Sequence, residues 1–153
     1  MAMYVLGTQC LLDIAKKDGN AAQRWFEGLA ARNIHLGDVC ISAISVVFLR
    51  FYFDDHPPQS PATRQLQTNL NLLIDQFKTA GAVLGCSREA VYYWADTLGN
   101  NVQYDQPPPA RAIDIEALVL ATVAVPPPGR QYTLVDRAQA VHQQLSIAVH
   151  DPY

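Results

Sequence analysis

Three acidic residues stand where the sequence could do chemistry. Asp114 and Glu116 lie two residues apart at the start of an apolar helical segment, and Asp136 directly follows the apolar run 132–135. Divalent cations such as Mg²⁺ keep much of their water shell, so they need several negative oxygens placed close together. On a helix, Asp114 and Glu116 project about 200° apart. A metal site would combine Glu116 with Asp114 or with Asp136.

The same acidic residues also have a purely structural interpretation. Carboxylates in the first turn of a helix complement its dipole, and this is the role that we favour for Asp114. Asp136 stands one step beyond a buried strand, where capping and turn residues are common. The sequence alone leaves both interpretations of Asp136 open.

A hydroxyl and two arginines could instead bind an anion. Thr8 follows Gly7 at the start of a helix, where backbone N–H groups point outward. Arg50 and Arg137 could supply a basic rim to such a pocket. The simpler interpretation makes Thr8 the N-cap of that helix and pairs Arg50 with a neighbouring acid.

The sequence has no pattern typical of a zinc site, a disulfide framework, a phosphate-binding loop or a catalytic nucleophile. The histidines are scattered and none is paired with a cysteine or another histidine at metal-ligand spacing, which argues against a zinc site. The three cysteines, an odd number, lie in apolar surroundings, as expected for reduced core residues. There is no Gly-rich phosphate loop and no nucleophile motif.

Composition predicts one globular domain over residues 1–153. The 153 residues carry 11 Lys and Arg against 14 Asp and Glu, a formal charge of −3, and half of them are hydrophobic. No apolar run reaches the length of a membrane span, and no basic residue precedes the apolar stretch at the start, as it would in a secretory signal. We therefore expect a cytoplasmic protein with no membrane partner, and no globally basic surface for nucleic acid.

Short apolar runs alternate with amphipathic helical segments along the chain. This alternation predicts a three-layer α/β/α fold around a parallel sheet of about five short strands. In such sheets, sites lie at the carboxyl ends of the strands. The polar, proline-rich stretch 54–62 is the clearest loop, and the aromatic cluster 51–53 before it suits self-association or a partner helix. We expect strands at 3–6, 39–42, 82–84, 132–135 and 147–149.

Four segments, in order, resemble the PIN-domain family, and the last is similar to the FitB and VapC branch. They are YVLGTQCLLDIAKKDGNAAQRWFEGLAARN, CISAISVVFLRFYF, IDIEALVLATVA and YTLVDRAQAVHQQLSIAVHDPY, which together span nearly the whole chain. The resemblance implies a fold of metal-dependent ribonucleases, many of them toxins held by an antitoxin, that form dimers. It also implies a cluster of acids holding one or two Mg²⁺ ions at the strand ends.

The acidic pattern of that family is mostly missing from this chain. The first acid falls on Gly7, the second on Phe48 and the fourth on Ala138, so only the third, Glu116, keeps its charge. Each missing carboxylate removes Coulomb attraction for a cation. Phe48 adds apolar bulk, which we expect to desolvate the cleft without supplying a ligand.

We therefore predict a degenerate, noncatalytic PIN-like protein that needs no cofactor. It would bind a protein partner, such as an antitoxin-like polypeptide, or RNA, and would form a homodimer. The alternative is a Mg²⁺- or Mn²⁺-dependent ribonuclease toxin of a type II toxin–antitoxin system, using Glu116 with Asp114 or Asp136. A small-molecule sensor is a third class, for which the sequence has no positive motif.

Overall fold

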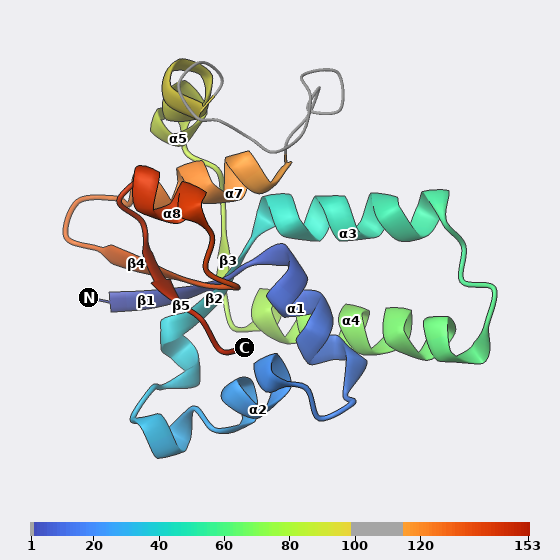
Figure 1. Ribbon diagram of the computed structural model, residues 1–153. Helices are drawn as coiled ribbons and strands as arrows, with labels where there is room; N and C mark the ends of the chain where they lie inside the picture. The colour runs from blue at the N-terminus through green and yellow to red at the C-terminus, as the bar shows by residue number, and fades with distance from the viewer. Residues whose placement is uncertain (1, 99–114) are drawn as a thin grey trace.

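The strands form one parallel sheet in the middle of the molecule (Figure 1). This computed structural model describes residues 2–98 and 115–153. Within them the sheet has five strands in the order β3-β2-β1-β4-β5, and every neighbouring pair is parallel. Each predicted strand is present, with bounds shifted by at most one residue. The strands are β1 (Ala2–Leu6), β2 (Val39–Ser42), β3 (Val83–Leu84), β4 (Gln131–Val135) and β5 (Ala148–His150).

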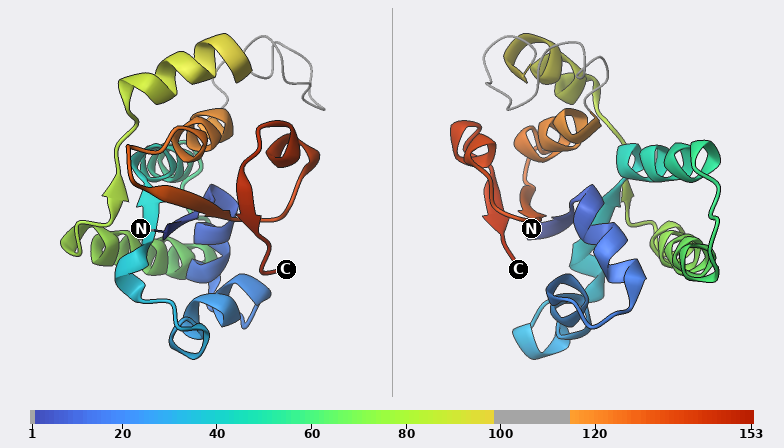
Figure 2. Two further views of the ribbon diagram at one scale, coloured as in Figure 1. Left: turned by 90° about the vertical axis from the view of Figure 1, so that its left-hand side faces the viewer. Right: turned by 45° about the vertical axis from the view of Figure 1, so that its right-hand side comes forward.

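Helices cover both faces of the sheet, which confirms the three-layer α/β/α architecture (Figures 1 and 2). On one face α1 packs against α2 and α4, and on the other α7 packs against α3 and α5. These helices are α1 (Thr8–Lys16), α2 (Ala21–Glu27), α4 (Pro61–Thr79), α3 (Ala43–Asp55), α5 (Arg88–Tyr93) and α7 (Ile115–Ala124). A short helix, α8 (Ala140–Gln144), leads into β5, 3₁₀ turns occupy Ala30–Arg32 and Leu36–Asp38, and a π-helical stretch, Trp94–Leu98, continues α5.

The core lies where the central strands meet the two helical layers. Val5, Leu6, Val39, Ile41 and Leu134 are at most 1% exposed. Continuous apolar runs of this kind are typical of parallel strands, because helices cover both faces of the sheet. The apolar runs therefore correspond to β1, β2 and β4, the three central strands of the sheet.

The loop predicted over 54–62 is shorter than expected, because helices occupy both of its ends. Helix α3 continues through Asp55, and α4 begins at Pro61. Ser60 caps α4 in a reciprocal capping box with Thr63. Proline suits the first helical position because its missing N–H would have no partner there. Helices α3 and α4 thus form a long hairpin that projects from the body of the molecule (Figure 1).

Parallel pairing brings the carboxyl ends of β1 and β4 to the same edge of the sheet. Gly7 follows β1 and donates its N–H to the carbonyl oxygen of Val135, 3.0 Å away. Asp136 follows β4, so these two segments meet directly. Among the described residues, no helix is both long enough and apolar enough to cross a membrane.

Candidate functional site

The carboxyl group of Asp136 fills the space above Gly7. A Cβ atom placed on Gly7 would come 2.6 Å from the carboxyl carbon of Asp136 and closer still to its Oδ2. Contacts this short do not occur between real side chains. Glycine at position 7 is therefore what allows Asp136 to lie across the end of β1.

Burial sets the protonation preference of Asp136, which is only 8% exposed. Loss of water raises the pKa of this carboxyl group, and the charges of Asp13 and Asp151 act in the same direction. The backbone N–H of Arg137, which donates to Oδ1 at 2.7 Å, opposes the rise. Asp136 is thus an acid held in a site that disfavours its charge.

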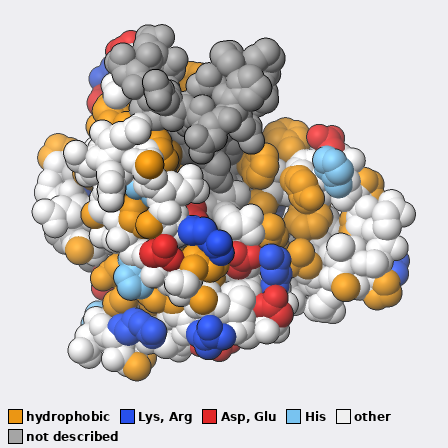
Figure 3. All heavy atoms as spheres, viewed as in Figure 1, with side chains coloured by type: hydrophobic (Ala, Val, Ile, Leu, Met, Phe, Trp, Pro, Cys, Tyr) orange, Lys and Arg blue, Asp and Glu red, His pale blue; other side chains and the backbone are white. Residues whose placement is uncertain are grey.

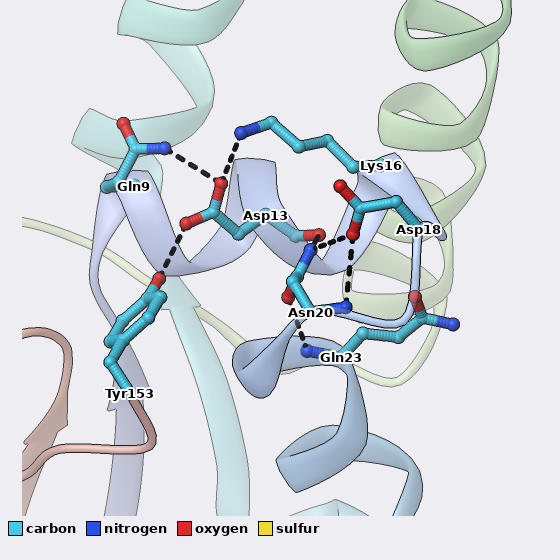
Figure 4. A network of polar contacts seen from close by, with 7 residues as sticks. All are labelled: Gln9, Asp13, Lys16, Asp18, Asn20, Gln23 and Tyr153. Carbon is cyan, nitrogen blue, oxygen red and sulfur yellow. Dashed lines mark hydrogen bonds and ion pairs between the residues drawn. The ribbon is translucent and has the colours of Figure 1, made fainter.

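A second carboxylate, Asp13 of α1, lies close enough for its charge to act on Asp136, and Figure 4 shows its polar contacts. Its Oδ1 accepts hydrogen bonds from Gln9 Nε2 at 2.9 Å and from Lys16 Nζ at 2.6 Å. Its Oδ2 accepts one from the hydroxyl of Tyr153 at 2.7 Å. Burial alone would raise the pKa of Asp13, but its side-chain donors and the charge of Lys16 lower it below the usual range. Asp13 is therefore an ionised carboxylate whose two oxygens are both engaged.

The segment after β5 folds back over these acids. The guanidinium carbon of Arg137 lies 4.5 Å from the centre of the Tyr153 ring. The carboxylate of Asp151 accepts the backbone N–H groups of Ala138 and Tyr153, each at 2.9 Å. Burial, followed by the hydrogen bond to Asp13, raises the pKa of the Tyr153 hydroxyl above its ordinary value. Tyr153 therefore stays neutral and donates.

Thr8 does not cap α1, contrary to the simpler interpretation. The N-cap is Gly7, and Thr8 is the first helical residue. Its hydroxyl is buried and lies 2.8 Å from the hydroxyl of Ser45 in α3. This buried pair joins α1 to α3.

The remaining predicted site residues lie in different places. Arg137 is at the strand ends, whereas Arg50 lies on α3 and lines the groove between α3 and α4. Asp114 lies outside the described residues. Glu116 is the second residue of α7, and its side chain also lies outside what the structure describes.

Two positions that replace expected acids have roles of their own. Phe48 is 37% exposed on α3, with its ring centre 6.5 Å from that of Tyr52. Its ring is thus partly exposed beside that of Tyr52. The backbone N–H of Ala138 is bonded to Asp151.

The described residues do not fit a divalent cation by themselves. No three Asp, Glu, His or Cys side chains in this part of the chain are arranged to hold a metal ion. Asp13 is already paired with Lys16, and Asp136 with the Arg137 amide. A resident Mg²⁺ would have to compete with these donors.

Sequence reasoning missed Asp13 and Tyr153. Asp13 lies on the buried side of α1, between Leu11 and Ile14, and is only 8% exposed. An acid among apolar helical positions is a signal that could have pointed to it. Its contact with Tyr153 spans 140 residues of sequence, which no local pattern reveals.

A groove of about 460 Å³ between α3 and α4 is a second candidate site. Leu49, Leu70 and Ile74 lie beneath it and are at most 2% exposed. Its accessible lining is therefore mostly polar, and it carries Arg50, Asp54 and Asp75 among other residues. Figure 3 shows hydrophobic side chains gathered along this lobe. Exposed large hydrophobic residues on the two helices are Val47, Phe48, Phe51, Tyr52 and Leu72.

Comparison with known proteins finds likeness only at the level of structure. The sequence matches no protein-family profile and no curated protein. A solved structure of FitAB bound to an IR36 DNA fragment superposes with a TM-score of 0.65 at 17% identity, covering 98% of this chain and 95% of that one. FitAcB from Neisseria gonorrhoeae gives 0.61 at 18% identity, covering 98% of both chains. DNA-bound VapBC from Salmonella typhimurium gives 0.60 at 16% identity over the full length of both.

These neighbours establish the fold. The chain has the architecture of the PIN-domain toxins in FitAB and VapBC complexes, which is the branch that its sequence resembles. At sequence identities below 20%, functional residues of the neighbours cannot be assigned to positions in this chain. Function therefore has to be argued from the site itself.

Proposed function

We propose that this chain is a degenerate, noncatalytic PIN-like protein of the FitB and VapC type that binds an antitoxin-like protein partner. The observation that carries the proposal is the end of β1. Gly7 stands where the first acid of the family pattern is expected, and Asp136 fills the space that any side chain there would need. An acid at position 7 would require the Asp136 side chain to move or to be replaced.

The carboxylates that remain support the same conclusion. Asp13 is held by Lys16 at 2.6 Å, so a cation would have to displace an existing charge partner. Burial favours the neutral form of Asp136, which weakens its pull on a cation. With Phe48 and Ala138 at two further acid positions, the described residues supply fewer clustered negative oxygens than Mg²⁺ needs.

The groove between α3 and α4 is the surface that we assign to the partner. Its accessible lining is mostly polar and carries charges of both signs, which fits a peptide segment that pairs with those charges. A net charge of −3 favours a protein over RNA, because RNA affinity comes largely from basic side chains. The partner would therefore be a polar peptide segment that carries charges of both signs.

The opposite side of α3 is the surface that we assign to a second copy of the chain. Val47 and Phe51 lie one helical turn apart, so they share a face. They are 48% and 63% exposed. The groove is lined instead by Leu49 and Phe53, which face about 200° away from Val47 and Phe51. A homodimer and a bound partner can thus use different faces of one helix.

Partner binding is tested by co-expression with the small protein encoded beside the gene. We expect the two proteins to co-purify, and Arg50→Glu on the groove rim to weaken the complex at least tenfold by calorimetry. Arg88→Glu, an exposed arginine on α5 away from the groove, is the matched control. Equal loss in both variants, or no effect of Arg50→Glu, would count against the groove.

The alternative is a Mg²⁺- or Mn²⁺-dependent ribonuclease using Glu116 with Asp114 or Asp136. What favours it is that Asp136 keeps a carboxyl group at the end of β1 despite the loss of an acid at position 7. It predicts metal-dependent RNA cleavage that disappears in Glu116→Ala. The noncatalytic proposal predicts no such activity.

A further inference from the structure

We infer that Tyr153 is a displaceable latch that closes the strand-end cluster, defined as Cys10, Asp13 and Asp136. The Tyr153 hydroxyl donates to Asp13 Oδ2 at 2.7 Å. The hydroxyl also lies close enough to the Cys10 thiol to lower that thiol's pKa, and the charge of Asp136 helps to raise the pKa of the phenol. The phenol therefore contacts Asp13 and lies near the other two members of the cluster.

Contacts on three sides hold the latch in place. The ring lies under the Arg137 guanidinium at 4.5 Å, and the Tyr153 N–H donates to Asp151 Oδ1 at 2.9 Å. Asp151 is in turn anchored by the N–H of Ala138. Because these anchors come from the segment just after β4, they fix the tyrosine over that strand's end.

Tyr153 can move away from the cluster without breaking the backbone hydrogen bonds of the sheet. Strand β5 ends at His150, so Tyr153 lies beyond the ladder of backbone hydrogen bonds. Its side chain is 39% exposed, and both Arg137 and Asp151 lie on the surface. Segments held by a few solvent-exposed contacts open far more often than the core does.

What the latch covers is otherwise closed. Cys10 is 0% exposed and Asp136 is 8% exposed. A ligand or partner side chain that approaches these groups past the Tyr153 phenol has to displace it. This inference concerns access to the strand ends, so it does not depend on what occupies the groove between α3 and α4.

Alkylation of Cys10 by iodoacetamide, followed peptide by peptide with mass spectrometry on the folded full chain, tests the latch. We expect Tyr153→Ala to raise the Cys10 rate at least tenfold, and Tyr153→Phe, which keeps the ring over Arg137, to raise it less. Tyr92→Ala, the same change at an exposed tyrosine on α5, should leave the rate unchanged.

Cys40 separates latch opening from unfolding. It is buried in β2, where its thiol lies 3.4 Å from the carbonyl oxygen of Tyr4, away from the cluster. Faster labelling of Cys10 with Cys40 unchanged supports the latch. An unchanged Cys10 rate in Tyr153→Ala, or Cys10 and Cys40 accelerating together, overturns it.

Discussion

At the scale of single residues, Gly7 and Asp136 are complementary at the end of β1: the glycine leaves a space and the acid occupies it. Such paired residues act as a unit, so each is best tested together with its partner.

Gly7→Ala should destabilise the protein by about 2 to 4 kcal/mol, because the added methyl group overlaps the carboxyl group of Asp136. Gly7→Ala with Asp136→Gly should recover most of that loss. Urea unfolding of the four proteins in this double-mutant cycle measures the coupling. Additive effects of the two changes would contradict the complementarity.

Asp136→Asn should stabilise the protein at neutral pH, by on the order of 1 kcal/mol, since it removes a buried charge. The folded-state pKa of Asp136 is raised above its ordinary value of 3.8. The cost of ionising it is therefore present above the folded pKa and disappears as the pH falls below 3.8. The advantage of the variant should vanish over the same range.

The stability difference between wild type and Asp136→Asn, measured by urea unfolding from pH 7 to pH 3.5, checks this dependence. Asp13 behaves oppositely, because its lowered pKa makes its contribution disappear on acidification. Both proteins carry Asp13, so its effect cancels in the difference. A constant difference across the range would contradict the assignment of a raised pKa to Asp136.

At the scale of elements, α3 has two faces to which we assign different partners. Leu49 and Phe53 turn into the groove, while Val47 and Phe51 turn outward. A sequence this apolar, AISVVFLRFYF, predicts a helix but not which side is covered. Which side of α3 is covered depends on how α4 packs along α3 after the chain turns at the capping box of Ser60 and Thr63.

Phe51→Glu should convert a homodimer into a monomer, because it places a charge on the outward face of α3. Light scattering coupled to size exclusion should give twice 16.9 kDa for the wild type and 16.9 kDa for the variant. Tyr92→Glu, at another exposed aromatic, should leave the mass unchanged. A monomeric wild type would refute the dimer, and an unaffected dimer would place its interface elsewhere.

At the scale of the whole molecule, the sequence predicts the layers and the sheet because apolar runs and helical periodicity are local signals. It also places Asp136 and Arg137 at the strand ends, since parallel strands end at one edge. It could not reveal that Asp136 lies over Gly7, or that Tyr153 reaches Asp13. Those contacts depend on side-chain direction and on segments far apart in sequence.

The same long-range packing explains the mistaken expectation at Thr8. This residue looked like a helix cap, but its hydroxyl pairs with that of Ser45 in α3. The element that decides the outcome thus lies outside the local sequence.

The central claim is that this PIN-like fold does not cleave RNA through a metal ion. Its most direct test incubates mixed-sequence RNA with the purified protein and Mg²⁺ or Mn²⁺, with a Glu116→Ala, Asp136→Asn double variant in parallel. The account predicts equal background in both proteins with and without the metal. Metal-dependent cleavage by the wild type that the double variant lacks would contradict it.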